Sequence, residues 1–464
     1  DNDMNIYLHV ENAARELDSK LLLATIAASR GHNVLVSNIS GISRGMRSGI
    51  LAPGIFHTKS LTPGFDKIKN HQRHVDNGFL VTSIDEEGGL VDHGYDQFAK
   101  WRYSGETLGQ ASAAFGWGDE DTEALKRIYP KHSTKIHNTG SPRADLWKPF
   151  FSDYWGTPEG KPQRPFLLIS SNTGLANNVD RFHKIIKNHR KFGYYQRRPE
   201  TFAQHFGMFA EEGRMILAFI EAIQYLSHHN NGYDIVLRPH LNESVEAWKI
   251  YLEGIPNVHV IRKGPINAWL NHAFAVMHNG CTTALEATVS GKPVVTYVPF
   301  NQDYARGLAN ELGYRVESPN KLMLKINSLF EEMQSSDQKN INQQIPEIVS
   351  KKINLDNDKL AAERIIEVWE SLDNNNLSKP SNWIKLNWFL NVMKLRDMIG
   401  VGLKKLFPKK FGLNKENHKF PSLKRNDIDG RVSRLQSLLG IDKKLECKLF
   451  SDRTILIKRL KNLD

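Results

Sequence analysis

Short apolar runs alternate with longer amphipathic stretches from the N-terminus to about residue 372. In the first third of the chain, the runs are typical of buried strands, and the segments between them are long enough for helices. The expected strands cover residues 5–10, 33–37, 49–56, 78–84 and 111–118. After the first of them, "RELDSKLLLATIAASRG" predicts a helix that ends at Gly31. Strands separated by helices of this length predict a parallel α/β sheet.

A second series of the same kind follows the Gly/Pro turn in "KIHNTGSPRADLW". Its expected strands cover residues 164–171, 233–240, 258–264, 274–280 and 292–298, and a basic, aromatic stretch at 179–208 interrupts them. An amphipathic helix at 357–372 closes the series. The pattern predicts two α/β domains, residues 4–145 and 146–378, followed by a separate tail at 379–464.

Composition narrows the class of protein. A chain of 464 residues is long for one domain, and a hydrophobic content of 40% excludes a disordered protein. Only two cysteines are present, so we expect no disulfide framework and no metal site, and we expect a reducing cytosolic setting. We expect no signal peptide, and no apolar run reaches the roughly 18 residues of a membrane span.

The net charge of +11 lies entirely in the tail, where residues 379–464 hold 21 Lys and Arg against 8 Asp and Glu. The stretch 382–412 mixes aromatic residues with a set of cations: Lys385, Lys394, Arg396, Lys404, Lys405, Lys409 and Lys410. This mixture predicts association with an anionic membrane surface. The alternative is a helix that packs on the body of the protein. Nucleic acid is not an expected partner, because the body is nearly neutral and carries no recognised nucleic-acid motif.

Three consecutive carboxylates, Asp85, Glu86 and Glu87, follow the apolar run "FLVTSI" and precede Gly88 and Gly89. In a parallel sheet this places them at the carboxyl edge, where ligands bind. Crowded carboxylates raise one another's pKa, which suits a nucleophile or general base, and the glycines would allow close approach to a ligand. We therefore predict a catalytic acid loop here. A solvated turn is the alternative.

Other residues at the same predicted edge are weaker candidates for substrate contacts. Glu11 and the pair Arg15-Glu16 follow the first strand, although an acidic residue near a helix start is equally well explained by the helix dipole. The loop "FHTKSLTPGF" adds His57, Lys59 and Ser60 after another strand.

The most specific segment of the second half is "FAVMHNGCTTALEATVSGKPVVTY". We expect a buried strand, a tight turn and a helix whose free N–H groups favour a nucleotide phosphate. The predicted donor-binding residues here are His278, Asn279, Gly280, Thr282, Thr283 and Glu286, with Glu286 on a ribose. An ordinary β–α unit with a capping threonine is the alternative.

The motif "VLRPH" ends another strand of the second half. Arg238 is suited to pair with a phosphate, and His240 to donate to it or to protonate a leaving phosphate, so His240 is also a catalytic candidate. In "TGSPRADLW", Arg143 and Asp145 are expected to be structural. Neither half carries a G-x-G-x-x-G or Walker signature, which argues against dehydrogenases and P-loop enzymes.

Together these segments resemble the bacterial surface carbohydrate (polysaccharide) biosynthesis protein family. The resemblance covers most of residues 4–375 and is carried by "ENAARELDSKLLLA", "LAPGIFHTKSLTP", "TSIDEEGGL", "TGSPRADLW", "RPH" and "HNGCTTALEA". At a further remove the chain is similar to the retaining β-Kdo transferases. Their acidic motif reads closer to Glu-Asp-Gly, whereas this chain has Glu86-Glu87-Gly88, which leaves open which carboxylate is the key one.

This resemblance implies a GT-B fold, with two Rossmann-like domains facing a cleft, and a metal-independent glycosyltransferase without a cofactor. The implied donor is a CMP-activated 2-keto sugar acid, Kdo or a nonulosonate. The implied acceptor is a glycan or a lipid-linked glycan at the cytoplasmic face of the inner membrane. GT-B sialyltransferases divide the labour in a similar way, and of their His-Pro-type motif only His240 is carried over.

Two other enzyme classes share this architecture. A CDP-glycerol-type phosphotransferase would use the same phosphate-binding loops, and a UDP-GlcNAc 2-epimerase would make no glycoside. Whether a transferase retains or inverts the anomeric configuration depends on the distance between the carboxylate and the anomeric carbon, which the sequence does not give.

Overall fold

The computed structural model describes residues 3–91, 94–230, 232–304, 307–335, 345–372, 377–406 and 419–460, without the side chains of residues 90 and 400–406. The chain forms two compact units. Unit 1 comprises residues 1–146 together with 347–464, and unit 2 comprises residues 147–346.

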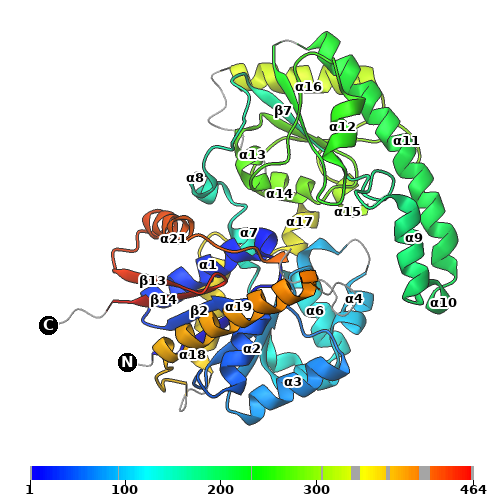
Figure 1. Ribbon diagram of the computed structural model, residues 1–464. Coiled ribbons are helices and arrows are strands. Elements are labelled where there is room, and N and C mark those ends of the chain that lie inside the picture. The colour runs from blue at the N-terminus through cyan, green and yellow to red at the C-terminus, as the bar shows by residue number, and fades with distance from the viewer. Residues whose placement is uncertain are drawn as a thin grey trace. The chain divides into compact units, whose positions relative to one another are not determined.

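Unit 1 is built on an eight-stranded sheet with the order β13-β14-β2-β1-β3-β4-β5-β6 (Figure 1). Its first six strands are mutually parallel: β1 (Asn5–His9), β2 (Asn33–Ser37), β3 (Ile55–Thr58), β4 (Leu80–Ile84), β5 (Ala111–Gly116) and β6 (Ile136–Asn138). The carboxyl ends of these strands therefore share one edge. Glu11, Lys59 and the 85–87 loop all follow strands at that edge.

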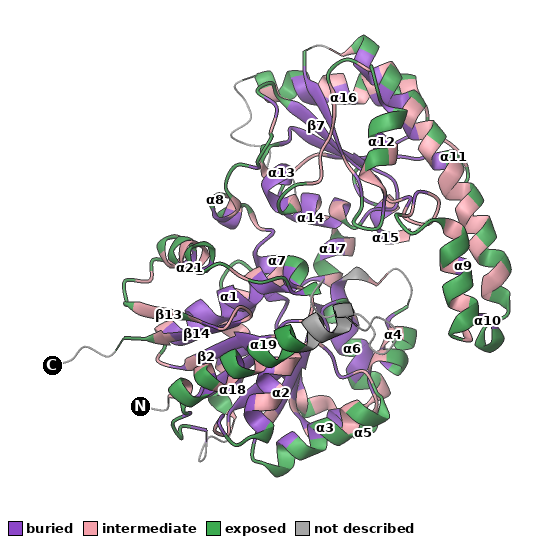
Figure 2. Cartoon of the chain, in the orientation of Figure 1, coloured by how far each residue is buried: buried purple, intermediate pink, exposed green. Residues whose placement is uncertain are grey.

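Helices cover both faces of this sheet. The helices are α1 (Ala13–Ser29), α2 (Ile39–Arg47), α3 (Phe65–Asp76), α4 (Tyr95–Arg102), α5 (Gly105–Gln110), α6 (Asp119–Ile128), α7 (Pro142–Asp145), α17 (Glu347–Lys352), α18 (Ala361–Ser371), α19 (Trp383–Leu406) and α21 (Arg425–Leu439). Short 3-10 turns cover Gly88–Leu90 and Pro130–Lys135. One apolar core joins alternate strand residues such as Tyr7 and Leu35 to α2 and α19. The residues of β1 to β5 are buried almost throughout, whereas those of the edge strand β13 are mostly half-buried (Figure 2).

The C-terminal segment completes the sheet of unit 1. Strand β14 (Thr454–Arg459) pairs antiparallel with β2, Leu456 opposite Leu35, and with β13 (Leu445–Phe450) on its other side. Residues Ile455, Leu456 and Ile457 are buried there. The described part of 379–464 is thus integrated into unit 1, and so are residues 347–372, which differs from the division predicted from the sequence. The apolar run "TILI" supplies strand β14, although basic residues predominate in the segment around it.

Helix α19 packs on the body through one side only. Leu386 and Leu390 enter the core of unit 1, and Leu386 comes close enough to α2 that a Cβ on Gly45 would lie 3.2 Å from its Cδ1. Of the predicted membrane stretch 382–412, residues 407–412 with Lys409 and Lys410 lie outside the described residues. The side chains of Lys404 and Lys405 are likewise outside that part. Nowhere in the described chain is a helix sufficiently long and apolar to cross a membrane.

Unit 2 contains a second, fully parallel sheet with the order β12-β11-β10-β7-β8-β9. Its strands are β7 (Phe166–Ser170), β8 (Asp234–Arg238), β9 (Val258–Val260), β10 (Ala275–His278), β11 (Val294–Tyr297) and β12 (Tyr314–Val316). Its helices are α8 (Ser152–Trp155), α9 (Phe182–Lys191), α10 (Tyr194–Arg197), α11 (Glu200–His229), α12 (Val245–Tyr251), α13 (Ile266–His272), α14 (Thr283–Val289), α15 (Gly307–Asn310) and α16 (Pro319–Gln334), with a 3-10 turn at Pro149–Phe151.

The basic, aromatic stretch at 179–208 forms a helical projection of unit 2. Helices α9 and α10 and the first part of α11 extend away from the sheet (Figure 1). Aromatic contacts hold these helices together, for example the rings of Phe182 and Phe209, whose centroids lie 4.2 Å apart. Because the stretch is helical and projects outward, β7 and β8 on either side of it in the sequence still pair with each other in the sheet.

The predicted fold class is confirmed: the chain is an α/β protein of two Rossmann-like units, each with a parallel sheet. One strand lies later than expected. Residues 49–56 were predicted as the third strand, but β3 spans Ile55–Thr58. Pro53 and Gly54 interrupt the run, and a Cβ on Gly54 would lie 2.4 Å from the carbonyl oxygen of Asn5, so only glycine fits there.

Candidate functional site

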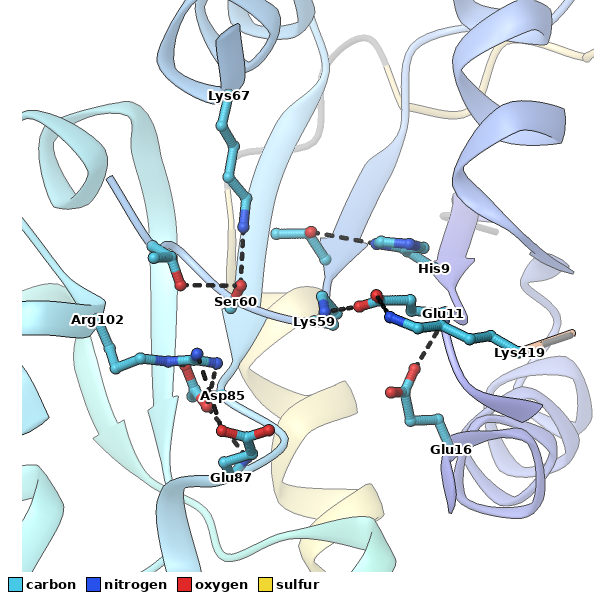
Figure 3. A network of polar contacts seen from close by, with 12 residues as sticks. His9, Glu11, Glu16, Lys59, Ser60, Lys67, Asp85, Glu87, Arg102 and Lys419 are labelled. Carbon is cyan, nitrogen blue, oxygen red and sulfur yellow. Dashed lines mark hydrogen bonds and ion pairs between the residues drawn. The ribbon is translucent and has the colours of Figure 1, made fainter. Parts of the chain in front are cut away.

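Asp85, the first carboxylate of the acid loop, is a structural anchor. Its side chain is 1% exposed and accepts two hydrogen bonds from Arg102, at 2.7 Å from Nε and 2.9 Å from Nη2 (Figure 3). It also accepts the backbone N–H of Glu87 at 3.0 Å. Burial raises the pKa of Asp85 above its ordinary value, and the hydrogen bonds from Arg102 offset part of this rise. With both oxygens occupied and no access to solvent, Asp85 fixes the loop.

Glu86 points into the interior of unit 1. Its Oε1 lies 2.5 Å from Nζ of Lys20, a residue of α1 that is itself fully buried. Glu16, one turn earlier on α1, lies close enough to Glu86 that burial and then the charge of Glu86 raise the pKa of Glu16 to about 7. Glu86 therefore belongs to a buried charge cluster and not to the open surface of the site.

Glu87 is the exposed carboxylate of the three. Its side chain is 52% exposed, and it lies 3.8 Å from Nη1 of Arg102, a long ion pair. The two glycines that follow are required by packing. A Cβ on Gly89 would lie 2.2 Å from Cε3 of Trp117, whose indole N–H donates to the carbonyl oxygen of Asp85 at 2.7 Å. The loop is thus built around Trp117 so that Glu87 alone faces outward.

His57 is a core residue and not a substrate ligand in this structure. Its side chain is fully buried, Nδ1 lies 3.0 Å from Oγ1 of Thr82, and the ring packs against Trp369 at 5.3 Å. Burial lowers its pKa well below the usual value. The expectation of a loop position failed because β3 begins at Ile55 and continues past His57, so that the side chain points into the sheet–helix interface.

Of the other weak candidates of the first half, Glu11, Arg15 and Lys59 reach the surface of unit 1, and Ser60 does not. Glu11 pairs with Lys59 and, at 2.6 Å, with Lys419 from the C-terminal segment (Figure 3). Arg15 is exposed on α1. Ser60 is buried, and its hydroxyl accepts a hydrogen bond from Lys67 at 2.7 Å.

Three cations of this network were not identified from the sequence: Lys20, Lys67 and Arg102. They come from helices whose sequences show ordinary amphipathic spacing, so no local motif marks them. The lysine at position 20 sits among leucines, and such a charge in an apolar run is the one signal that points to a buried pair.

In unit 2, His278 is buried at the end of β10. Its Nδ1 accepts the backbone N–H of Cys281 at 3.3 Å, which places the ring proton on Nε2, where it is donated to Oγ1 of Thr296 at 2.8 Å. Burial lowers the pKa of His278 to about 3. The residue shapes the turn and is not exposed to a ligand, contrary to the expectation that it binds the donor.

The next two residues of that turn lie at a pocket. Asn279 donates to the carbonyl oxygen of Tyr297 and exchanges hydrogen bonds with Gln302. Gly280 adopts φ +61° and offers its carbonyl oxygen to Asn172 at 2.6 Å. The pocket they share is also lined by residues from the β7 loop, α11 and the segment after β11: Asn172, Thr173, Met208, Glu211, Glu212, Met215, Gln302 and Tyr304.

Helix α14 begins differently from the prediction. Thr282 stands at the N-cap position with helical backbone angles, and its side chain makes no capping hydrogen bond. Thr283 accepts a hydrogen bond from Cys281 Sγ at 3.3 Å. Glu286 is buried and accepts from Asn267 at 3.3 Å. Of these three, Thr282 is exposed and Thr283 half-buried, so both hydroxyls are near the surface of this edge.

Arg238 and His240 lie together at the end of β8. Arg238 donates to the carbonyl oxygens of Lys263 and Gly264 at 2.9 and 2.5 Å, and burial, followed by the charge of Arg262, lowers its pKa to about 10. His240 is exposed, and its Nδ1 accepts from the backbone of Asn242 at 3.4 Å. Two donors of Arg238 thus hold a neighbouring loop, and the imidazole of His240 faces solvent.

Glu243, which the sequence reading missed, organises this edge of unit 2. The side chain is fully buried. Its Oε2 accepts from Ser171 Oγ, Thr173 Oγ1 and Trp248 Nε1, and its Oε1 from the backbone N–H of Thr173 and His240. The carboxylate therefore ties the loop after β7, which lines the pocket, to the loop after β8.

The sequence matches no family model and no curated protein. Among solved structures, the chain is similar to a protein from Listeria monocytogenes described as a candidate UDP-N-acetylglucosamine 2-epimerase, with 13% identity, a TM-score of 0.48 and coverage of 82% of this chain and 100% of that one. It is similar also to a glycosyltransferase from Rickettsia africae, with 12% identity, a TM-score of 0.46 and coverage of 81% and 100%.

A third similar structure is the UDP-GlcNAc 2-epimerase from Neisseria meningitidis bound to UDP-GlcNAc, with 14% identity, a TM-score of 0.42 and coverage of 79% and 99%. Likeness at these identities concerns the fold, and the activity of this chain has to be argued from its own residues.

Proposed function

We propose that this chain is a glycosyltransferase that moves a 2-keto sugar acid from a CMP-activated donor to a glycan acceptor. The observation that carries the proposal is the construction of the acid loop. Asp85 and Glu86 are held in buried ion pairs, and Glu87 is thereby presented to solvent at the carboxyl edge of the parallel sheet. A fixed, exposed carboxylate at this edge is suited to act as nucleophile or base at an anomeric carbon.

Unit 2 would bind the nucleotide in this proposal. The carboxyl edge of its sheet carries the pocket beside Asn279 and Gly280, with Thr282, Thr283 and His240 exposed or half-exposed on neighbouring loops. Hydroxyl, imidazole and backbone donors are the groups that stabilise a leaving phosphate. Arg238 and Glu286 would stabilise the loops of this edge, because both already make hydrogen bonds within it.

The test is a donor screen by mass spectrometry with the full chain. CMP-Kdo, CMP-N-acetylneuraminate, CDP-glycerol and UDP-GlcNAc would be incubated with and without glycan acceptors, with the Glu87→Gln variant run in parallel. The proposal expects release of CMP and a glycoside product that Glu87→Gln does not form. Transfer of phosphoglycerol from CDP-glycerol, or epimerisation of UDP-GlcNAc without acceptor, would replace the proposal by the corresponding rival.

We also propose that the enzyme works on an anionic membrane surface at the cytoplasmic face. The support comes from the outer side of α19, where large apolar residues follow one another at helical spacing: Ile384, Trp388, Val392, Leu395, Met398 and Ile399. Ile384 is 86% exposed and Trp388 66% exposed, while Leu386 and Leu390 on the other side are buried. Lys385 and Arg396 accompany the stripe, so apolar insertion and charge attraction act together.

A further inference from the structure

Lys67 is a half-buried cation that makes no ion pair with the described residues of the chain. It lies in the first turn of α3, and its ammonium reaches back to the loop after β3, where Nζ donates to Ser60 Oγ at 2.7 Å (Figure 3). Among the described residues, no carboxylate lies within 4.0 Å of this nitrogen. Removing an ammonium from water without pairing it is costly, so the position favours a bound anion as the partner that the described residues do not supply.

Ser60 has an unused hydrogen at the same place. Its hydroxyl oxygen accepts from Lys67 and, at 3.3 Å, from Thr62. Since both of these contacts use the oxygen as acceptor, the O–H of Ser60 is left to donate. An ammonium and a hydroxyl that both retain donor hydrogens, and that touch each other, form a natural pair of donors for an oxyanion.

The surrounding charges strengthen this preference. Each carboxylate nearby already has a cation of its own: Asp85 and Glu87 contact Arg102, and Glu11 contacts Lys59 and Lys419. Burial, and then the positive charge of Lys59, lower the pKa of Lys67 to about 8. The local excess of positive charge would be relieved by one bound anion.

We propose that Lys67 and Ser60, flanked by Lys59, form a subsite that binds an oxyanion group of the substrate, a carboxylate or a phosphate. Lys67 would supply the charge-assisted hydrogen bond and Ser60 the second donor. Lys59 would add attraction from the loop position next to Ser60.

The subsite deepens the proposed function, and it rests on that function only in assigning the anion to a sugar substrate. A sugar acid would bring a carboxylate, whereas a phosphorylated acceptor would bring a phosphate. Both groups present negatively charged oxygens that accept hydrogen bonds from N–H and O–H donors, so the experiment has to distinguish them.

The experiment measures binding without turnover, by calorimetry on the full chain. The probes are free Kdo and N-acetylneuraminate for the carboxylate, inorganic phosphate and glucose 6-phosphate for the phosphate, and N-acetylglucosamine as an uncharged sugar. The variants are Lys67→Met, which keeps the apolar stem, and Lys67→Arg, which keeps the charge. Lys69→Met is the matched control, because Lys69 is exposed on the same helix.

The expected result is that at least one class of anionic probe binds and the uncharged sugar does not. Lys67→Met should weaken that binding about 10-fold or more, the scale of a lost hydrogen bond to a charged group, while Lys67→Arg and Lys69→Met stay close to the parent. Which class binds identifies the source of the anion.

Two outcomes of the binding experiment would overturn the subsite: no anionic probe binds the parent chain, or anions bind equally well to the parent and to Lys67→Met. Failure of the proposed function looks different. Lys67-dependent anion binding in a chain that transfers no sugar from any nucleotide leaves the subsite standing and removes glycosyl transfer. Glycosyl transfer with unchanged substrate KM in Lys67→Met removes the subsite and leaves the proposed function standing.

Discussion

Lys20 and Glu86 form an ion pair inside unit 1, with 2.5 Å between Nζ and Oε1 and almost no solvent access to either side chain. The pair joins α1 to the loop that carries the candidate catalytic carboxylate. It separates two neighbouring glutamates into different roles, because Glu86 is fixed in the interior and Glu87 is left outside.

Breaking this pair should destabilise the protein. Glu86→Gln removes one charge and leaves the Lys20 ammonium buried, and the expected loss in the free energy of unfolding is about 3–5 kcal/mol. Urea unfolding followed by circular dichroism measures the loss. The double variant Lys20→Met with Glu86→Gln should recover a substantial part of the stability, since the buried ammonium is removed together with its partner. An unchanged urea midpoint in Glu86→Gln would contradict the structural assignment.

Glu87→Gln should leave stability unchanged and reduce turnover. The side chain is about half exposed and makes one long contact with Arg102, so the urea midpoint should stay close to the parent. Glycosyl transfer in the donor screen should fall by about 10²-fold or more, the scale of a lost acid–base or nucleophilic group. Glu106→Gln, an exposed glutamate on α5 of the same unit, is the matched control and should retain full turnover. Equal turnover in both variants would exclude Glu87 as the catalytic group.

The sequence predicted the alternation of strands and helices because buried parallel strands are continuous apolar runs, and it placed the acid loop at the correct sheet edge. It did not distinguish Asp85, Glu86 and Glu87 from one another. Their partners, Arg102 and Lys20, lie on helices at unrelated positions in the chain. The direction of each side chain is therefore a tertiary property.

Two further differences have the same origin. A polar residue near a strand end is typical of ligand-binding sites, and the sequence therefore predicts that His57 contacts the substrate and His278 binds the donor. Each satisfies a ring nitrogen with a threonine of the adjacent strand, Thr82 and Thr296 respectively. Strand register decides this, and one sequence without its pairing partners does not fix the register.

Glu243→Gln should loosen the loops after β7 and β8 of unit 2. All of the groups facing the carboxylate are donors, and the amide nitrogen of glutamine would point a donor at donors in either orientation. The expected loss in unfolding free energy is about 2–4 kcal/mol, from one or more buried groups left unsatisfied. Urea unfolding gives the value, and Glu246→Gln, exposed on α12, should change it by less than about 0.5 kcal/mol. Similar midpoints for the two variants would argue against the role of Glu243.

His278 should make the protein sensitive to acid. Its pKa is about 3 in the folded state against an ordinary value of 6.5, so protons bind more tightly to the unfolded chain. The stabilisation is fully present above pH 6.5 and is lost as the pH falls through the window from 6.5 towards 3, at up to about 1.4 kcal/mol per pH unit. In His278→Asn the unfolding free energy should depend less steeply on pH, because one fewer proton is taken up on unfolding. Urea unfolding of both chains across the window tests the difference, and parallel pH curves would contradict it.

The outer face of α19 should determine binding to anionic membranes. Truncating the tail would not test this cleanly, because removal of β14 exposes the edge of β2 and destabilises unit 1. A triple variant, Ile384→Ser, Trp388→Ser and Leu395→Gln, changes only exposed side chains, so folding should be retained. The measurement is co-sedimentation with vesicles that contain phosphatidylglycerol. The parent should sediment with them, less so at high salt, and the triple variant should lose most of its binding because each apolar contact contributes to partitioning. Leu217→Ser, an equally exposed leucine on α11, is the matched control and should bind as the parent does. If the triple variant sediments as well as the parent, α19 is not the membrane-binding element.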